Sequence, residues 1–544
     1  MSLSVSAAVI QATTSRMFES SRQMVDRGAY AGEEVLIGHS GLTQEDLADL
    51  QQAAEQVGDR KLLRVLQAIS AAMKTGGDLM VPSFKAFESI LKAYLSKDAI
   101  HGWIFLREAD GHLYPFLVQD VSFCAARGAY DHDTVKISTV AYTRTESRDG
   151  KRVGAAVRAF HFQASEVARK KVSDILLGAG LYKETEALHA EYEASATRFF
   201  GEVRGGFAEQ FRVTGVVKER ESSRHEREGL DRMSGHRVIH DLPAWECGPL
   251  ELSSESSLLH EEGEAPPMPV HLLVLVFDLG DHQHYWVHSD SITPYQYDQS
   301  LRDKLVLPRA HRDLLDILTT DLDAFVEDIV EGKSAGNVIL CKGLPGVGKT
   351  LTAEVYAELM RRPLYIMRAG RLGTTPSQIA ESLQLVFSRA LRWNCVLVLN
   401  EADVFIARRG TNVAQNAIVA EFLHTLEYFE GLLFMSTNRP DDIDDAVISR
   451  CAAIIEYEVP DEAGTRAIWK VMAAQNEVEL EESLLSDLVN AFPGIAPRDI
   501  KNLLRLVLKV VAAGKGPLAI ETFRRCAMFR AIKMTAPAEG VEAQ

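Results

Sequence analysis

The sequence predicts an α/β protein: an open parallel sheet with helices on both faces, preceded by an α+β region and followed by a small helical domain. Three observations support this fold class. Between residues 337 and 360 an apolar strand pattern passes through a glycine-rich turn into a helical pattern. Two further apolar runs, "PLYIM" and "CVLVL", are separated by a helical stretch at about 376–391, an alternation typical of parallel sheets. Beyond residue 461 the spacing is helical.

The chain is long and acidic. Its 544 residues fit three or four domains, and its net charge of −17 disfavours nucleic acid as a partner. The longest apolar runs, such as "VHLLVLVF", are too short to span a membrane, and the N-terminus lacks the pattern of a secretion signal. The six cysteines are scattered without a CxxC pair, which indicates reduced thiols. We therefore expect a cytoplasmic protein without a membrane anchor.

The part of the chain before the central sheet divides into four predicted segments. Residues 1–99 form a helical region, in which Thr43 opens a capping box. Residues 100–252 form an α+β domain, because short β-type runs are separated by Asp-Gly turn signals and followed by helical spacing. Residues 253–269 are rich in Ser, Glu and Pro and indicate a linker. Residues 270–335 contain a hairpin and an entry segment that leads into the central sheet.

Three histidines on that hairpin allow two interpretations. His282, His284 and His288 could hold a metal ion, but zinc needs three or four converging ligands and no Cys or second His pair has suitable spacing. Exposed hairpin histidines are the favoured interpretation.

The glycine-rich turn predicts a phosphate-binding site. The pattern GxxxxGK[ST] extends from Gly343 to Thr350, directly after a strand and directly before a helix, and this context makes the match strong. Glycines let backbone N–H groups turn inward around phosphate oxygens, and the helix N-terminus adds the positive end of its dipole. Lys349 would supply a charge to the terminal phosphates, and the Thr350 hydroxyl a ligand for Mg²⁺. Residues 336–460 are thus predicted to be a P-loop NTPase core that binds ATP and Mg²⁺. The predicted nucleotide contacts here are Gly343, Pro345, Gly346, Val347, Gly348, Lys349, Thr350 and Leu351.

The stretch "CVLVLNEAD" places polar residues at the end of a buried strand. Cys395 to Leu399 reads as the third parallel strand, and ligands of an open α/β sheet collect at the carboxyl ends of its strands. Asn400 and Glu401 should therefore lie beside the Mg²⁺ and the attacking water. Thr350 and Asn400 are the predicted metal residues, and Glu401 is a predicted catalytic residue.

Residues 301–535 resemble the AAA branch of the AAA+ ATPases. The resemblance rests on "GLPGVGKT", "VLVLNEAD", "FMSTNRP" and "DIDDAVISR". Within that branch, the chain looks closest to bacterial and fungal AAA proteins related to the mitochondrial Rieske-protein translocase. Residues 1 to about 265 bring no confident resemblance.

The resemblance implies further roles. Asn438 would be the sensor that orients the lytic water, and Arg450 an arginine finger that reaches the γ-phosphate of a neighbouring subunit. Arg498 would be a second, nucleotide-contacting sensor in a helical lid at 461–535. An ordinary surface arginine at 450 and a helix-start ion-pair partner at 498 are the alternatives. Residues 536–544 are predicted to be a disordered tail.

Asn400 stands where the family has an Asp. The change keeps the shape and an acceptor oxygen but removes a negative charge beside a divalent cation, so Mg²⁺ binding should suffer. Glu401 is intact, and we expect slow or magnesium-sensitive ATP hydrolysis, with Asp403 as a possible substitute charge.

An arginine finger implies a homo-oligomer, and the resemblance implies a hexameric ring. Three functions remain open: an ATPase ring that remodels a protein client chosen by the N-terminal domains, an ATP-gated assembly or signalling scaffold with little turnover, and a DNA-associated AAA+ machine. The loop 370–378 lacks the aromatic residue of peptide-threading relatives, which makes threading of an unfolded chain doubtful.

Overall fold

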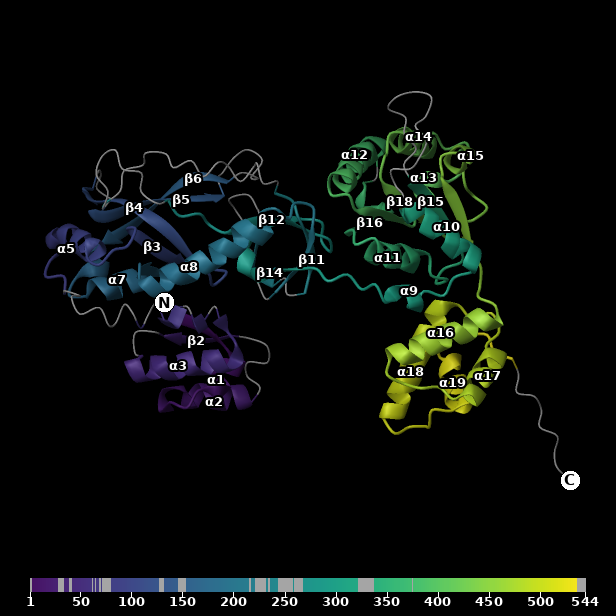
Figure 1. Cartoon of the computed structure of the whole chain (residues 1–544), viewed down its shortest axis with the longest axis horizontal. Coiled ribbons are helices and arrows are strands. Elements are labelled where there is room, and N and C mark those ends of the chain that lie inside the picture. Colours follow the sequence, from purple (N-terminus) through teal and green to yellow (C-terminus); the bar gives the residue numbers. More distant parts are fainter. Residues whose placement is uncertain are drawn as a thin grey trace. The chain divides into compact units, whose positions relative to one another are not determined.

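The computed structural model forms two compact units (Figure 1). The N-terminal unit comprises Met1–Phe207 and Phe211–Pro294, and the C-terminal unit comprises Ala208–Gln210 and Tyr295–Gln544. The described residues are 2–27, 34–38, 42–60, 62–63, 65–67, 70, 80–126, 132–144, 153–214, 217–220, 231–232, 235–242, 258, 268–320, 337–373 and 375–535. The predicted tail at 536–544 and almost all of the predicted linker at 253–269 lie outside the described residues.

The first part of the N-terminal unit is not purely helical. Strands β1 (Ser2–Ser6) and β2 (Glu34–Gly38) pair antiparallel, with Val5 opposite Val35. Both valines are buried, and so is Ile37 of β2. In β2 the buried residues alternate along the strand, a period-two pattern that helical spacing does not predict. The helices are α1 (Ala7–Ala12), α2 (Glu19–Asp26) and α3 (Gln44–Val57). The structure corrects the helical interpretation of 1–99 to an α+β one, and it confirms the capping box at Thr43.

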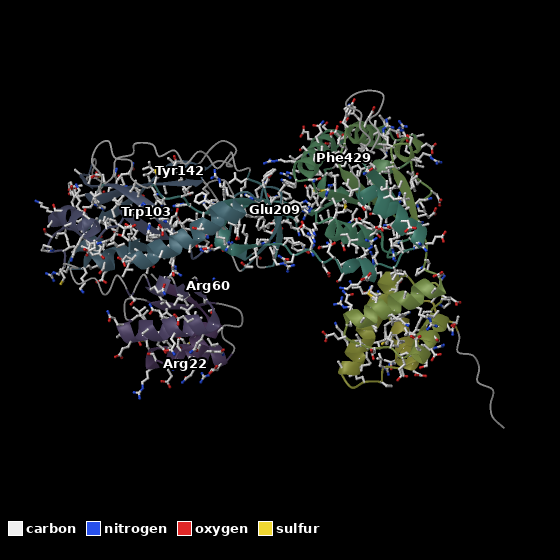
Figure 2. All side chains as sticks on the ribbon, viewed as in Figure 1. Arg22, Arg60, Trp103, Tyr142, Glu209 and Phe429 are labelled. Atoms are coloured by element: carbon white, nitrogen blue, oxygen red, sulfur yellow. The ribbon has the colours of Figure 1, made fainter. Side chains whose placement is uncertain are left out.

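A five-stranded antiparallel sheet follows, in the order β6-β5-β4-β3-β7. Its strands are β3 (Trp103–Arg107), β4 (Leu113–Cys124), β5 (Thr134–Arg144), β6 (Val153–Gln163) and β7 (Leu181–Lys183). The accompanying helices are α5 (Phe84–Ser96), α6 (Ala164–Val167), α7 (Val172–Gly178) and α8 (Glu186–Arg198). Trp103, labelled in Figure 2, is buried. The predicted antiparallel sheet is confirmed.

The predicted hairpin lies inside a second sheet of the same unit, in the order β10-β9-β13-β12-β11-β8-β14. Its strands are β8 (Gln210–Val213), β9 (Val217–Arg220), β10 (Asp231–Arg232), β11 (Arg237–His240), β12 (Leu273–Asp278), β13 (His284–His288) and β14 (Ile292–Pro294). Strands β12 and β13 pair antiparallel, which confirms the hairpin. Strand β12 also pairs with β11, and β13 with β9. These hydrogen bonds make the hairpin part of the N-terminal unit. The predicted segment 270–335 is thus divided: its hairpin belongs to the N-terminal unit, and its entry segment belongs to the C-terminal unit.

The C-terminal unit contains the predicted parallel sheet, in the order β16-β17-β18-β15-β19. Its strands are β15 (Asn337–Gly343), β16 (Leu364–Arg368), β17 (Val396–Asn400), β18 (Leu432–Thr437) and β19 (Ala453–Tyr457), and every pairing is parallel. Helices pack around the sheet (Figure 1): α10 (Arg309–Thr320), α11 (Lys349–Leu359), α12 (Pro376–Arg392), α13 (Asp403–Ile406), α14 (Val413–Glu427) and α15 (Asp445–Ile448). Buried Phe429, labelled in Figure 2, follows α14. The strand order brings the ends of β15, β17 and β18 to one edge.

Four helices complete this unit as a small cluster: α16 (Glu462–Gln475), α17 (Glu482–Ala491), α18 (Pro497–Ala512) and α19 (Ile520–Met528). Their core contains Trp469 and Phe523, whose rings meet edge to face at 5.6 Å. The entry segment contains α9 (Leu301–Lys304). It is tied to the end of α11, because the Tyr295 hydroxyl and the Asp298 N–H donate to the Glu358 carboxylate at 2.7 and 3.0 Å.

Candidate nucleotide site

The turn between β15 and α11 needs glycine for two separate reasons. Gly343, Gly346 and Gly348 have φ values of 144°, 86° and 109°, which disfavour residues with a Cβ. A Cβ at Gly343 would also lie 2.3 Å from the Tyr457 carbonyl oxygen, and one at Gly346 would lie 2.9 Å from the Arg498 Cβ. The turn therefore needs glycines ahead of the N-terminus of an 11-residue helix, the arrangement that lets backbone N–H groups face a phosphate.

Lys349 is the first residue of α11, and its ammonium group links the turn to Asn438, the residue that follows β18. The Nζ atom donates to the carbonyl oxygens of Gly343 and Leu344, both at 2.7 Å, and to Asn438 Oδ1 at 2.9 Å. Burial lowers the pKa of Lys349, and the Arg498 guanidinium acts in the same direction. The ammonium is thus held in a partly desolvated site, where it attracts an anion more strongly than in water.

Asn400 lies at the end of β17, and two hydroxyl groups donate to its side-chain oxygen. Thr350 Oγ1 donates at 2.9 Å and Ser436 Oγ at 3.2 Å. Ser436 also accepts from the Glu401 N–H at 3.2 Å. One buried serine on β18 therefore positions both residues that follow the apolar run of β17.

Two carboxylates, Glu401 and Asp403, follow Asn400 in the sequence. Glu401 is exposed, and its backbone has a left-handed φ of 55°, a conformation that is uncommon for a residue other than glycine and concentrates at functional sites. Asp403 is partly buried and accepts from the Thr437 hydroxyl. The negative charge of Asp403 opposes the lowering of the Lys349 pKa, so this carboxylate acts electrostatically on the phosphate-binding lysine.

Arg498 lies where the helical cluster contacts the phosphate-binding turn. It lies at the start of α18, and its backbone N–H donates to the Gly346 carbonyl oxygen at 3.1 Å. The helical cluster thus touches the phosphate-binding turn directly. The contact is made by the backbone, so the second-sensor role of the side chain stays a prediction.

Arg450 is held by neighbouring elements of its own protomer. Its guanidinium donates to the Ala446 carbonyl oxygen at 3.1 Å and pairs with the Glu427 carboxylate of α14 at 3.5 Å. About a third of each side chain of that pair is exposed (33% and 30%). The arginine-finger role also stays a prediction.

The remaining predicted residues lie in different surroundings. Val347 packs in the core under the turn, while Pro345 lies in the turn itself and Leu351 is exposed on α11. Sequence reasoning missed Ser436 and Thr437. A polar pair at the end of the apolar run "LLFM" was the available signal, but only the β17–β18 pairing shows what the pair contacts.

The donor set fits ATP and, less well, Mg²⁺. Three glycines, an ammonium group, a helix N-terminus and Arg498 offer the positive and N–H groups that a polyphosphate needs. Oxygen ligands suit Mg²⁺, and Thr350 and Asn400 supply oxygens, but both are neutral. The nearest acidic groups in sequence are Glu401 and Asp403.

The hairpin histidines are not a metal site with one another. His288 is buried, which corrects the exposed interpretation, and His284 pairs with Asp241 at 2.7 Å. His288 instead approaches His112 and Asp290, with possible ligand atoms within 4.8 Å of one another. The two rings stack at 3.9 Å and 14°. His112 Nε2 already bonds the Ser291 hydroxyl at 2.8 Å, and His288 Nδ1 accepts from the Asp290 N–H at 3.2 Å.

Comparisons with known proteins agree with this site. A family model described as "ATPase family associated with various cellular activities (AAA)" matches residues 339–459. A putative 26S proteasome regulatory subunit homolog of Methanothermobacter marburgensis is 28% identical over 33% of this chain and 50% of its own length. The outer mitochondrial transmembrane helix translocase of Danio rerio is 28% identical over 31% of this chain and 46% of its own.

The chain thus spans half or less of each of these relatives. A chain in the solved structure of the E. coli MS115-1 HORMA:CdnC:Trip13 complex matches 45% of this chain and 94% of its own length, at a TM-score of 0.36 and 18% identity. Among the helices of the described ranges, none has both the length and the apolar character that crossing a bilayer requires.

Proposed function

Because the chain contains an AAA ATPase domain, matched over residues 339–459, we propose that it is a ring-forming ATPase that binds and hydrolyses ATP to remodel a protein partner. The N-terminal unit, with its two antiparallel sheets, is the part that selects this partner. The proposed ring is a homo-hexamer, and the proposed location is the cytoplasm.

One observation carries the proposal: hydrogen bonds join three separate segments into one cluster. Lys349 links the phosphate-binding turn to Asn438 after β18, and Thr350 links the first turn of α11 to Asn400 at the end of β17. The fold itself does not require an ammonium, an amide, a hydroxyl and an exposed carboxylate at one edge of the sheet. Phosphoryl transfer uses all four groups.

Each side chain then has a task in hydrolysis. Lys349 binds the terminal phosphates, and Asn438 holds the lysine and is placed to orient water. Mg²⁺, when bound near Thr350 and Asn400, would neutralise phosphate charge. The exposed Glu401 carboxylate is free to accept a proton from water, the role of a general base. Arg450 serves a neighbouring protomer's site.

Asn400 favours one alternative. With a neutral amide in place of a carboxylate, magnesium is held less strongly and hydrolysis slows. A scaffold that assembles on ATP and hydrolyses little of it is the second candidate, and this residue is the observation that favours it.

Turnover separates the two candidates. We expect the full chain to hydrolyse ATP in a Mg²⁺-dependent way, and Glu401→Gln to lose hydrolysis while still binding a fluorescent ATP analogue. Lys349→Ala should lose both. Equal, background-level turnover in the wild-type chain and the Glu401 variant, with binding retained in both, would favour the scaffold.

Assembly and partner class are tested separately. Native mass spectrometry with and without ATP measures the ring, and a monomer under both conditions contradicts it. Capture with residues 1–294 as bait tests the protein partner, because these residues include the whole N-terminal unit. The DNA-associated machine predicts salt-dependent DNA binding, and the net charge of −17 argues against it.

A further inference from the structure

A buried carboxylate joins the loop after the catalytic residues to the short helix ahead of Arg450. Arg409 follows α13, and three of its nitrogen atoms donate to Asp444. The backbone N and Nε reach Oδ2 at 3.3 and 2.9 Å, and Nη2 reaches Oδ1 at 3.2 Å. Bidentate pairing of this kind fixes orientation as well as distance.

The two partners differ in burial, since the Arg409 side chain is 47% exposed and the Asp444 side chain only 7%. Asp444 is only 5% exposed, and its pKa is lowered first of all by its hydrogen bonds to Arg409. A buried carboxylate that lost this partner would keep its charge without the partner's compensation. The link is ordered because four hydrogen bonds meet on the buried carboxylate, three from Arg409 and one from the Ala446 N–H.

Asp444 is also the N-cap of α15, the helix that leads to Arg450. Its Oδ1 accepts from the Ala446 N–H at 3.0 Å, and its own N–H donates to the Ile406 carbonyl oxygen at 2.8 Å. At the end of α15 the Arg450 N–H donates to the Val447 carbonyl oxygen at 3.1 Å, and the Arg450 guanidinium donates to the Ala446 carbonyl oxygen. The position of Arg450 thus depends on where Asp444 holds the first turn.

The other end of the link begins at the catalytic carboxylate. Glu401 leads into α13 (Asp403–Ile406), and Arg409 lies three residues beyond that helix. The Gly410 N–H and carbonyl oxygen are tied to Asn416 of α14 at 3.0 and 2.7 Å, so the segment is anchored on both sides. A shift of the loop that contains Glu401 would therefore move Asp444 and α15 with it.

We propose that Arg409 and Asp444 form a clamp through which each protomer's own catalytic loop sets the position of the Arg450 that it presents to its neighbour. Arg409 is a positioning residue that acts through Arg450, and the inference rests on the proposed ring ATPase. It predicts a directional effect: the clamp matters in the protomer that donates the arginine and not in the protomer whose nucleotide is hydrolysed.

Mixed rings of full-length chains test the direction. Lys349→Ala protomers cannot bind nucleotide but can donate Arg450, while Arg450→Ala protomers bind nucleotide but cannot donate. A mixture of the two restores turnover only at the Arg450→Ala site. Arg409→Ala is then added either to the donor or to the nucleotide-binding protomer, and ATP hydrolysis is measured at matched ratios.

We expect an approximately 100-fold loss with Arg409→Ala in the donor, the size that follows from a catalytic group misplaced by about 1 Å, and no loss in the other placement. Asp444→Asn in the donor should act alike, because it keeps an acceptor for the Ala446 N–H while removing the charge. Arg408→Ala in the donor is the matched control, since it removes a neighbouring positive charge and should leave turnover unchanged.

Every other outcome counts against the clamp. Equal loss in both placements would mean that Arg409 supports its own site, and no loss in either would remove its role. An inactive parent mixture, from partners that each bind or assemble as expected, would overturn the trans-arginine premise and the clamp with it. Arg409→Ala should unfold at a lower temperature but still cooperatively, because Asp444 keeps its bonds to the backbone N–H groups of residues 409 and 446. ATP-analogue affinity near wild type then excludes simple misfolding.

Discussion

The Thr350 hydroxyl donates a hydrogen bond of 2.9 Å to the side-chain oxygen of Asn400. This contact joins the helix of the phosphate-binding turn to the strand that ends beside it. Asn400 therefore offers an acceptor oxygen to this helix, as an aspartate would, and what it lacks is the charge. The contact separates the geometric role of this residue from its electrostatic role, which substitution can test.

Asn400→Asp should restore that charge. A unit charge pair at 4 Å contributes roughly 4 kcal/mol at an effective dielectric near 20, and separation by a water reduces this value, so we expect the Mg²⁺ concentration for half-maximal hydrolysis to fall about tenfold. Magnesium titrations of ATP turnover measure the shift. Asn412→Asp is the control, because it makes the same chemical change at the exposed N-cap of α14. An unchanged titration would show that charge at position 400 is irrelevant.

Glu401→Gln should uncouple binding from hydrolysis. The side chain is exposed at the site, and its amide analogue has the same shape but cannot accept a proton from water, so turnover should fall by about 10²–10⁴-fold. Affinity for a fluorescent ATP analogue should stay at the wild-type value. If turnover persists, another group acts as the base, and Asp403 is the next residue to substitute.

Ser436→Ala should weaken catalysis although the residue was absent from the predicted site. Its hydroxyl bonds both the Asn400 oxygen and the Glu401 N–H, each at 3.2 Å. Losing two hydrogen bonds should cost about 1–3 kcal/mol of stability and reduce kcat by about tenfold, because Glu401 loses its backbone anchor. Steady-state kinetics and chemical unfolding measure the two effects. A loss of stability without any change in kcat would assign Ser436 to the core alone.

Gly343→Ala should destabilise the C-terminal unit. The new Cβ would lie 2.3 Å from the Tyr457 carbonyl oxygen, at a φ of 144°, so strand β15 or β19 must shift, and we expect a loss of more than about 2 kcal/mol. Gly410→Ala is the control, because a Cβ there meets nothing within 4 Å. Comparable thermal unfolding of the two variants would contradict the packing argument.

The N-terminal unit should lose stability in mild acid. Burial lowers the pKa of His271 to about 3 and that of His240 to about 4, whereas an unfolded histidine has a pKa near 6.5. As the pH falls below about 6.5 only the unfolded chain gains these protons, so stability present at neutral pH is lost by about 1.4 kcal/mol per pH unit for each group.

His271→Gln tests this linkage. The slope of unfolding free energy between about pH 5.5 and 4.5 should decrease by roughly 1.4 kcal/mol per pH unit, because glutamine does not titrate and can still donate to the Pro115 carbonyl oxygen, as His271 does at 3.0 Å. His161→Gln is the control, because it makes the same substitution at an exposed position of the same unit. Chemical denaturation across this pH range gives both slopes.

The sequence by itself determined the features that depend on neighbouring residues. The capping box at Thr43, the hairpin at 270–288 and the strand–turn–helix around Lys349 are set by local backbone preferences and short spacings, and the structure confirms each. The placement of Asn400 at a strand end followed from one apolar run.

Tertiary structure alone decided which distant residues complete the site. Ser436 contacts Asn400 because β18 lies beside β17, and Asp444 meets Arg409 across a gap of 35 residues. His288 is buried because its hairpin sits within a larger sheet. Such contacts depend on strand order and on the packing of segments far apart in the chain, where burial and hydrogen-bond satisfaction over the whole unit outweigh local preference.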